Sequence, residues 1–264
     1  MRNLVGQSIR TRHLSDRESA WLYANHPEVG FSPEDYCPTC EKRGTYVWKG
    51  QKRECDCELQ LQLLKHYLVA GIGATYQRLD WDDVADDSLV RQVGEYGLNH
   101  EYLRRGIGLF LVGDVGTGKT MVGTLCLKDF VKAGYRCFAI TFAQMIDMYT
   151  STWRSAEERN RFDKKVIGSQ VLLLDDIGKE HRLKNNLPEA TFDMVLRSRV
   201  QAGRSTIVTT NLRPDDVREG YGAAALSLLR EKSISIDVAG SDFRRQANAR
   251  ELDEVRRGET RPLT

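Results

Sequence analysis

Apolar runs of strand length alternate with segments of helical periodicity through most of the chain. The runs that predict strands are residues 108–112, 137–141, 171–174 and 206–209. The periodic segments that predict helices between them are residues 119–132, 142–153 and 188–202. Strands that alternate with helices in this way form a parallel sheet with helices on both faces. The pattern therefore predicts an α/β fold for the larger part of the chain.

The N-terminal part of the chain is organised differently. Weak periodicity predicts a short helix at 17–24, a group of cysteines fills 37–57, and a run with helical spacing predicts a helix at 58–69. Residues 73–85 have no clear period and predict a linker. We expect an N-terminal module, a connecting helix and linker, a main domain and a flexible charged tail, with the boundaries 1–58, 59–86, 87–246 and 247–264.

Composition limits the classes of protein to be considered. The chain has 264 residues, of which 41% are hydrophobic and 29% charged, so it can build one mid-sized core and a smaller one. Its net charge of +2 excludes a bulk polycation, and any contact with nucleic acid must come from a local patch. No apolar run approaches the ~20 residues of a membrane helix, and the first residues lack an export signal. We expect a soluble, cytoplasmic protein without a membrane contact.

The strongest motif follows the first predicted strand of the main domain and opens a helix. It matches the phosphate loop G-x₄-G-K-[ST] and consists of Gly113, Asp114, Val115, Gly116, Thr117, Gly118, Lys119 and Thr120. Glycines let backbone N–H groups approach phosphate oxygens, and the helix N-terminus adds partial positive charge. Lys119 is expected to contact the β- and γ-phosphates, and the Thr120 hydroxyl to bind Mg²⁺. The motif predicts ATP and Mg²⁺ as ligands, and an ordinary glycine-rich turn is the alternative.

Two further polar positions fit such a site. The third predicted strand ends in Asp175 and Asp176, of which the first is expected to hold Mg²⁺ and the second to polarise the attacking water. The fourth ends before Asn211, whose carboxamide is expected to sense the γ-phosphate or the water. A turn cap is the alternative for each. Many such ATPases have Glu at the position of Asp176, so turnover is expected to be slow without a partner.

Four cysteines follow the spacing C-x₂-C-x₁₄-C-x-C, and they are Cys37, Cys40, Cys55 and Cys57. Four thiolates suit the tetrahedral preference of a structural Zn²⁺, and the residues between the pairs predict a small hairpin, as in a zinc ribbon. The single residue between the second pair is less usual. A redox pair is the alternative, although no βαβ context surrounds it.

The three elements of the nucleotide site resemble those of the AAA+ ATPases, and among them the helicase loaders of the DnaC/DnaI type and the IstB-like transposition ATPases. The resemblance covers roughly residues 70–245 and rests on GDVGTGKT, VLLLDDIG, RVQAGRSTIVTTNL and GSDFR. It implies an AAA+ P-loop fold, self-association on ATP binding, and contact with single-stranded DNA and a hexameric replicative helicase. DnaI-type loaders also carry an N-terminal zinc module, which IstB-like relatives usually lack.

The resemblance also implies two roles for arginines. Arg244 matches a position that contacts nucleotide within the same subunit. An arginine finger that reaches a neighbouring subunit is expected just upstream, but the usual position holds Leu228, so Arg230 is the candidate and Arg199 is a second one.

Aromatic and basic residues also alternate after the second predicted strand. Trp153 and Arg154 are the candidates for contact with single-stranded DNA, because aromatic rings stack on bases and arginines neutralise phosphates. Burial of Trp153 in the core is the alternative.

The function predicted from the sequence is ATP-dependent loading of a hexameric replicative helicase onto single-stranded DNA. An IstB-like ATPase that assists a transposase and a nucleotide-binding adaptor without significant hydrolysis are the alternatives. Asp176 in place of the usual Glu, and Leu228 in place of the usual Arg, are the residues that favour the adaptor.

Overall fold

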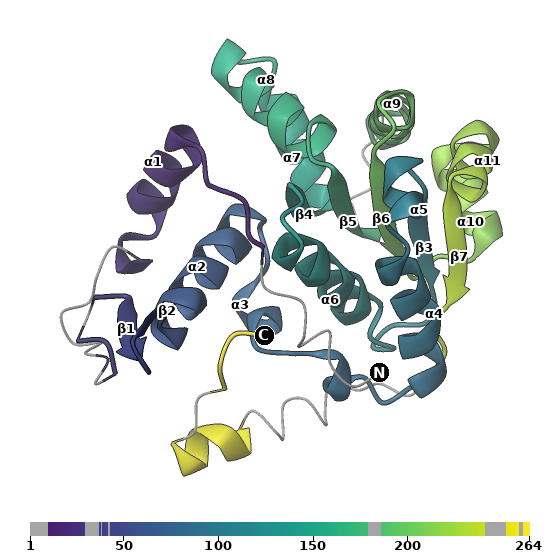
Figure 1. Cartoon of the computed structure of the whole chain (residues 1–264). Helices are drawn as coiled ribbons and strands as arrows, with labels where there is room; N and C mark the ends of the chain where they lie inside the picture. The colour runs from purple at the N-terminus through teal and green to yellow at the C-terminus, as the bar shows by residue number, and fades with distance from the viewer. Residues whose placement is uncertain are drawn as a thin grey trace.

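A five-stranded parallel sheet forms the centre of the protein (Figure 1). The computed structural model describes residues 10–29, 37, 39–41, 43–178, 186–240, 252–258 and 261–264. The strands of the sheet, in chain order, are β3 (Gly108–Val112), β4 (Cys137–Thr141), β5 (Val171–Ile177), β6 (Ser205–Thr210) and β7 (Ser233–Asp237). They lie side by side in the order β4-β5-β6-β3-β7, and every neighbouring pair is parallel. The predicted α/β fold is confirmed.

Helices cover both faces of this sheet. Helix α6 (Lys119–Lys132) lies on one face, with α2 (Asp56–Val69) and α4 (Asp87–Leu98) packed against its outer side. The helices of the other face are α7 (Phe142–Ser151), α9 (Leu187–Gln201) and α11 (Ala223–Glu231). Shorter segments that connect these elements are α5 (His100–Arg104), α8 (Ala156–Phe162), η3 (Asp163–Ile167) and α10 (Pro214–Tyr221). None of the helices in the described ranges is long and apolar enough to cross a membrane.

Alternate residues of the central strands supply two separate hydrophobic cores. Leu109 and Leu111 of β3 pack under α6 and α4, whereas Phe110 between them packs under the helices of the opposite face. This follows from the two-residue period of a strand, and it explains why the strands read as continuous apolar runs: both faces are buried.

The N-terminal part lies beside α6, at the side of the molecule away from β7 (Figure 1). Its elements are α1 (Asp16–Asn25), η1 (Pro27–Val29), the hairpin strands β1 (Thr45–Trp48) and β2 (Gln51–Glu54), α2, α3 (Ala74–Gln77) and η2 (Trp81–Asp83). Ser15 caps α1 through a reciprocal pair of hydrogen bonds with Glu18. Leu22 of α1, Val29 and Val69 of α2 form a small core of their own.

Residues 261–264 lie against the body of the protein, which differs from the fraying expected of a charge-rich tail. Leu263 is buried, and the Gln60 side chain bonds both its backbone N–H and its carbonyl oxygen. Arg261 forms an ion pair with Asp83 at 3.0 Å. The side chain of Leu263 and these bonds to α2 and η2 compensate for the low apolar content of the segment.

Two further elements differ from the sequence analysis. The expected linker at 73–85 contains α3 and η2. Strand β7 at the sheet edge is absent from the predicted strands, although its alternation of polar and apolar residues over five positions is the pattern of a half-buried strand.

Candidate functional site

The phosphate loop lies between the carboxyl end of β3 and the first turn of α6. Gly113 has no space for a Cβ atom, which would collide with the carbonyl oxygen of Val238. Gly116 and Gly118 have φ angles of 85° and 92°, in the left-handed region that favours glycine. The loop sits next to β6 and β7, where the order of strands reverses, and this is the usual position of ligands in open parallel sheets. Its backbone can therefore approach a phosphate group closely.

The polar side chains of the loop turn back onto it. Lys119 is 5% exposed, and its Nζ donates to the carbonyl oxygen of Asp114 at 2.6 Å. The Thr117 hydroxyl donates to the same oxygen at 2.9 Å. Val115, in contrast, is exposed at the tip of the loop. The ammonium group is therefore held at the N-terminus of α6, where the helix dipole also favours an anion.

Asp175 meets the phosphate loop across the sheet. The Thr120 hydroxyl donates to Asp175 Oδ1 at 2.9 Å and to Oδ2 at 3.2 Å. The Thr209 hydroxyl, on the neighbouring strand β6, donates to Asp175 Oδ1 at 2.6 Å. Asp175 is 9% exposed, so this carboxylate is held by hydroxyl groups from two elements. A hydroxyl and a carboxylate oxygen are the donors that Mg²⁺ prefers, and these two fit that ion.

A bulge in β5 separates Asp176 from Asp175. The register with β6 shifts between Leu174 and Ile177, and Asp176 has a φ angle of 58°. The Asp176 backbone N–H donates to the Thr209 hydroxyl oxygen at 2.9 Å. Thr209 thus bonds the side chain of one aspartate and the backbone of the next. Thr209 is not among the candidate residues of the sequence analysis, because its contact with Asp175 depends on the register between β5 and β6. Its position in the Thr-Thr-Asn element is the one sequence signal that points to it.

Asn211 follows β6 directly, at the same edge of the sheet as the phosphate loop and the two aspartates. The preceding residue fixes this turn: the Thr210 hydroxyl donates to the carbonyl oxygen of Ile177 and accepts the N–H of Leu212. The structure therefore brings the three predicted parts of the nucleotide site to one edge.

The three candidate arginines have different positions. Arg199 is fully buried, and its guanidinium donates to carbonyl oxygens that include those of Val166 and Ser205. It cannot reach a neighbouring subunit, so its candidacy as a finger is wrong. Burial lowers the pKa of Arg199 to about 9. Arg230 is exposed in the last turn of α11. Arg244 lies outside the described residues.

The four cysteines of the N-terminal module come together at the start of α2. Their sulfur atoms all lie within 4.8 Å of one another, with Cys37 and Cys55 3.7 Å apart and Cys40 and Cys57 3.4 Å apart. Tetrahedral Zn²⁺ with Zn–S bonds of about 2.3 Å needs sulfur atoms about 3.8 Å apart, so the donor set fits zinc. Backbone N–H groups of Cys40 and Thr39 lower the pKa of the Cys37 thiol to about 6, whereas burial and the neighbouring thiols raise the pKa of Cys57.

Trp153 lies on the surface after α7. It is 65% exposed and packs edge-on against Tyr149, with ring centroids 6.0 Å apart. Arg154 beside it is also exposed. Met145 of α7 is fully buried. Helix α7 thus buries Met145, whereas Trp153, two residues beyond the end of the helix, is exposed to solvent.

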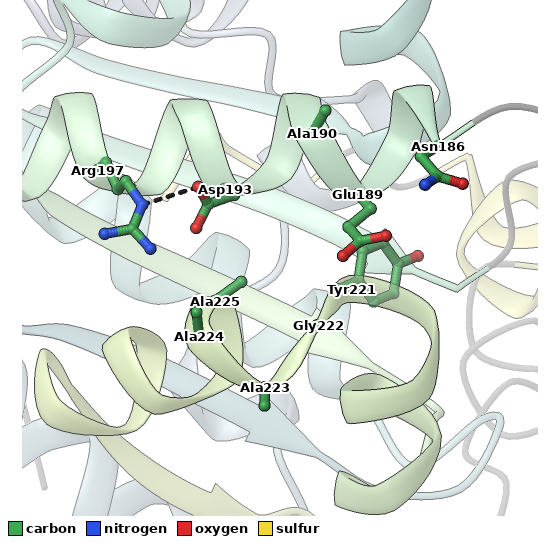
Figure 2. Close-up of a pocket in the computed structure, with 10 residues that line it drawn as sticks. All are labelled: Asn186, Glu189, Ala190, Asp193, Arg197, Tyr221, Gly222, Ala223, Ala224 and Ala225. Carbon is green, nitrogen blue, oxygen red and sulfur yellow. Dashed lines mark hydrogen bonds and ion pairs between the residues drawn. The ribbon is translucent and has the colours of Figure 1, made fainter.

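A separate surface cavity of about 460 Å³ lies between α9 and the junction of α10 with α11; its lining residues are drawn in Figure 2. Glu189 and Asp193 line it, and Arg197 donates to Asp193 at 2.7 Å. No residue of the phosphate loop is among the described residues that line it. The cavity is therefore separate from the predicted nucleotide site at the edge of the sheet.

Comparison with known proteins assigns the family. The model for IstB-like ATP-binding proteins matches residues 74–249, so this chain belongs to that family. The replicative helicase loader DnaI of Bacillus subtilis (strain 168) is 22% identical over 173 residues, which are 64% of this chain and 55% of the relative. An insertion sequence IS21-like putative ATP-binding protein of Bacteroides fragilis (strain YCH46) is 32% identical over 113 residues, which are 41% of this chain and 54% of the relative. The chain thus spans about half the length of these relatives.

Solved structures with a similar fold come from replication proteins. The crystal structure of the DnaC helicase loader has a TM-score of 0.53 and 24% identity, covering 59% of this chain and 91% of that chain. The crystal structure of DnaI has a TM-score of 0.53 and 19% identity, covering 66% and 94%. DnaA structures, among them one bound to AMPPCP, match at a similar level. At these identities the likeness concerns the fold, and the predicted AAA+ P-loop fold class is confirmed.

Proposed function

We propose that this chain is a Mg²⁺-dependent ATPase that loads a hexameric replicative helicase onto single-stranded DNA in the cytoplasm, and that it self-associates on ATP binding. The observation that carries the ATPase part is the bond between the Thr120 hydroxyl and Asp175, which joins the first turn of α6 to the end of β5. A nucleotide-binding loop alone binds phosphate, whereas this pair adds the oxygen donors of a metal site.

Each residue of the edge has a role in this proposal. Backbone N–H groups of Gly113–Thr120 bind the phosphates, Lys119 neutralises their charge, and Thr120 with Asp175 would hold Mg²⁺. The metal supplies charge stabilisation at the β- and γ-phosphate oxygens. Asp176 orients and deprotonates the attacking water, and Asn211 donates a hydrogen bond to the γ-phosphate or that water. Arg230 of one subunit, and Arg244 within the subunit, complete the charge balance.

Two observations support the loader role. DnaI matches this chain over more residues than the IS21-like relative does, 173 against 113. The cysteine cluster, which can hold Zn²⁺, precedes that region and gives the chain a separate module for a protein partner. In this role Trp153 stacks on a base and Arg154 contacts a phosphate.

A second candidate function is assistance to a transposase. It is favoured by the higher identity, 32%, to the IS21-like relative, and by the family match itself. Both functions use the same ATPase chemistry, so only the partner distinguishes them.

The first experiment measures ATP turnover of the purified chain and of Lys119→Ala. We expect Mg²⁺-dependent turnover that the variant loses, because the lysine neutralises the transferred phosphoryl group. Lys132→Ala, at the far end of the same helix, is the matched control and is expected to turn over ATP normally. Equal turnover in Lys119→Ala and the original chain would contradict the ATPase proposal. The nucleotide-binding adaptor without significant hydrolysis would then be the remaining function.

The partner is identified by capture from host lysate with ATP and Mg²⁺ present. A replicative helicase that is recovered by the original chain, and lost in Cys40→Ser with Cys57→Ser, supports the loader. Recovery of a transposase assigns the second candidate.

Arg230 is tested in the assembled protein. Arg230→Ala is expected to lower turnover by roughly 10³–10⁵-fold while ATP binding stays intact, since an arginine finger acts on the transition state. Arg218→Ala on α10 is the control, and full activity of Arg230→Ala would contradict the assignment.

A further inference from the structure

The β1–β2 hairpin is a second surface on which aromatic and basic residues meet. Its two strands pair antiparallel and are joined by Lys49 and Gly50, whose φ angles of 48° and 77° are those of a type I′ turn. Beyond the pairing between β1 and β2, no other helix or strand of the described ranges packs extensively on them. The hairpin is therefore a ribbon that projects from the cysteine cluster.

Strand register divides the hairpin into two faces. Tyr46 pairs with Arg53 and Trp48 pairs with Gln51, so these four side chains share one face. Val47 and Lys52 pair with each other on the opposite face. One face thus presents two aromatic rings and a guanidinium, and the other presents an aliphatic residue and a lysine.

The aromatic face is open to solvent. Trp48 is 55% exposed and Tyr46 is half-buried. Residues two apart on a strand lie about 6.7 Å apart along it. The two rings are thus spaced as a platform for two successive bases of an extended strand, which is how aromatic pairs on sheet surfaces bind single-stranded nucleic acid.

The charge of the hairpin is strongly positive. Residues 43–54 contain four basic residues and one acidic residue, Glu54, in a chain whose overall charge is only +2. Arg43 is paired with Glu41 at 2.5 Å. In the described part of the chain, no ion pair engages Lys49 or Arg53. Both cations are free to contact phosphates at the tip and on the aromatic face.

We propose that the β1–β2 hairpin is a binding site for single-stranded nucleic acid, in which Trp48 and Tyr46 stack on bases while Lys49 and Arg53 contact phosphates. Exposed rings beside cations on an open ribbon favour this ligand over a protein partner. The excess of cations in residues 43–54 suits a polyanionic strand, since each cation can neutralise one phosphate.

This inference goes beyond the proposed function, because it gives the N-terminal module a contact with the strand in addition to Trp153. It rests on that function only for the choice of nucleic acid as ligand. Two linked contacts bind the same strand with higher avidity than either alone. The hairpin thus lets the zinc module hold the strand independently of the ATPase unit.

The test is fluorescence anisotropy of a labelled oligo-dT with the 264-residue chain purified with Zn²⁺, over a series of salt concentrations. Trp48→Ala is expected to weaken binding by roughly 5-fold or more, and Trp48→Phe to retain most of it, because stacking needs an aromatic ring. Val47→Ala on the opposite face is the matched control and is expected to bind normally. Arg53→Gln is expected to reduce the slope of log affinity against log salt by about 0.7. Unchanged zinc content and melting temperature in each variant show that the hairpin is folded.

The outcomes separate this inference from the proposed function. If Trp48→Ala binds oligo-dT normally while Trp153→Ala does not, the hairpin site is wrong and the DNA contact of the ATPase unit stands. If Trp48→Ala binds oligo-dT normally but no longer captures a helicase from lysate, the hairpin is a protein contact and the inference is overturned. Loss of binding in Trp48→Ala with ATP turnover unchanged supports the inference.

Discussion

Thr209 lies between the two acidic residues that end β5. Its hydroxyl donates to the Asp175 carboxylate and accepts the backbone N–H of Asp176, so a single group fixes both the side chain of the first and the bulge that sets the direction of the second. Thr209 is fully buried and cannot touch a nucleotide itself. It is a positioning residue, and it acts through Asp175 and Asp176.

Thr209→Val tests this positioning role at constant volume. The change removes the hydroxyl that accepts the Asp176 N–H and donates to the Asp175 carboxylate. We expect ATP turnover to fall about 10- to 100-fold and the Mg²⁺ concentration for half-maximal turnover to rise. Thr209→Ser keeps the hydroxyl and is expected to restore both values. Normal Mg²⁺ dependence in Thr209→Val would exclude a role in positioning.

Elements with strong local signals could be predicted from the sequence, and those that depend on the sheet could not. The strand at Gly108–Val112 and the helix at Lys119–Lys132 have the predicted bounds, since a buried apolar run and a phosphate loop mark them. The bulge at Asp176 and the burial of Arg199 depend on neighbouring strands and helices. No spacing in the sequence predicts either feature. An arginine that donates to buried carbonyl groups and an arginine that faces a partner subunit can stand in the same sequence pattern.

Helix α2 connects the cysteine cluster to α6, and His66 is one of its buried ionisable groups. His66 is 8% exposed. Burial, with the nearby charge of Arg12, lowers the pKa of His66 to about 4, although Glu18 acts in the opposite direction. Between pH 6.5 and pH 4 the unfolded chain therefore binds a proton that the folded chain does not. The free energy of unfolding rises with pH in this window and falls as the solution is acidified.

We expect the chain to lose on the order of 2 kcal/mol of stability through His66 between pH 6.5 and pH 4, after allowance for partial solvent screening. His66→Gln removes this titration, so its stability is expected to fall less steeply over the same range. Urea unfolding at several pH values measures the difference between the two slopes, in which acid effects on other groups cancel. His100→Gln on α5 is the matched control, and equal slopes for His66→Gln and the original chain would contradict the expectation.

At the scale of the whole molecule, two units share α2. Cys55 is its N-cap and Cys57 lies in its first turn, and its later residues Leu63 and Tyr67 belong to the core under the sheet. The hairpin contributes no residue to either core of the sheet. Residues 261–264 link α2 to α6, since Leu263 bonds Gln60 and the Lys128 ammonium on α6 donates to the Thr264 hydroxyl. The sheet and α2 thus form one unit on which the cysteine module is mounted.

We propose that the four cysteines hold Zn²⁺, and chelation is then expected to loosen the module and spare the nucleotide site. After chelation, the amides of β1 and β2 should lose protection from hydrogen exchange, because metal binding supplies much of the folding free energy of such small modules. The affinity for a fluorescent ATP analogue should stay within about 2-fold, since the phosphate loop and α6 are held by the two cores of the sheet. Cys126→Ser is the opposite control: it changes a buried residue of α6, and should lower the melting temperature while the metal content stays at one ion per chain. If chelation instead weakens nucleotide binding strongly, the cysteine cluster stabilises α6 through α2, and the two units act as one.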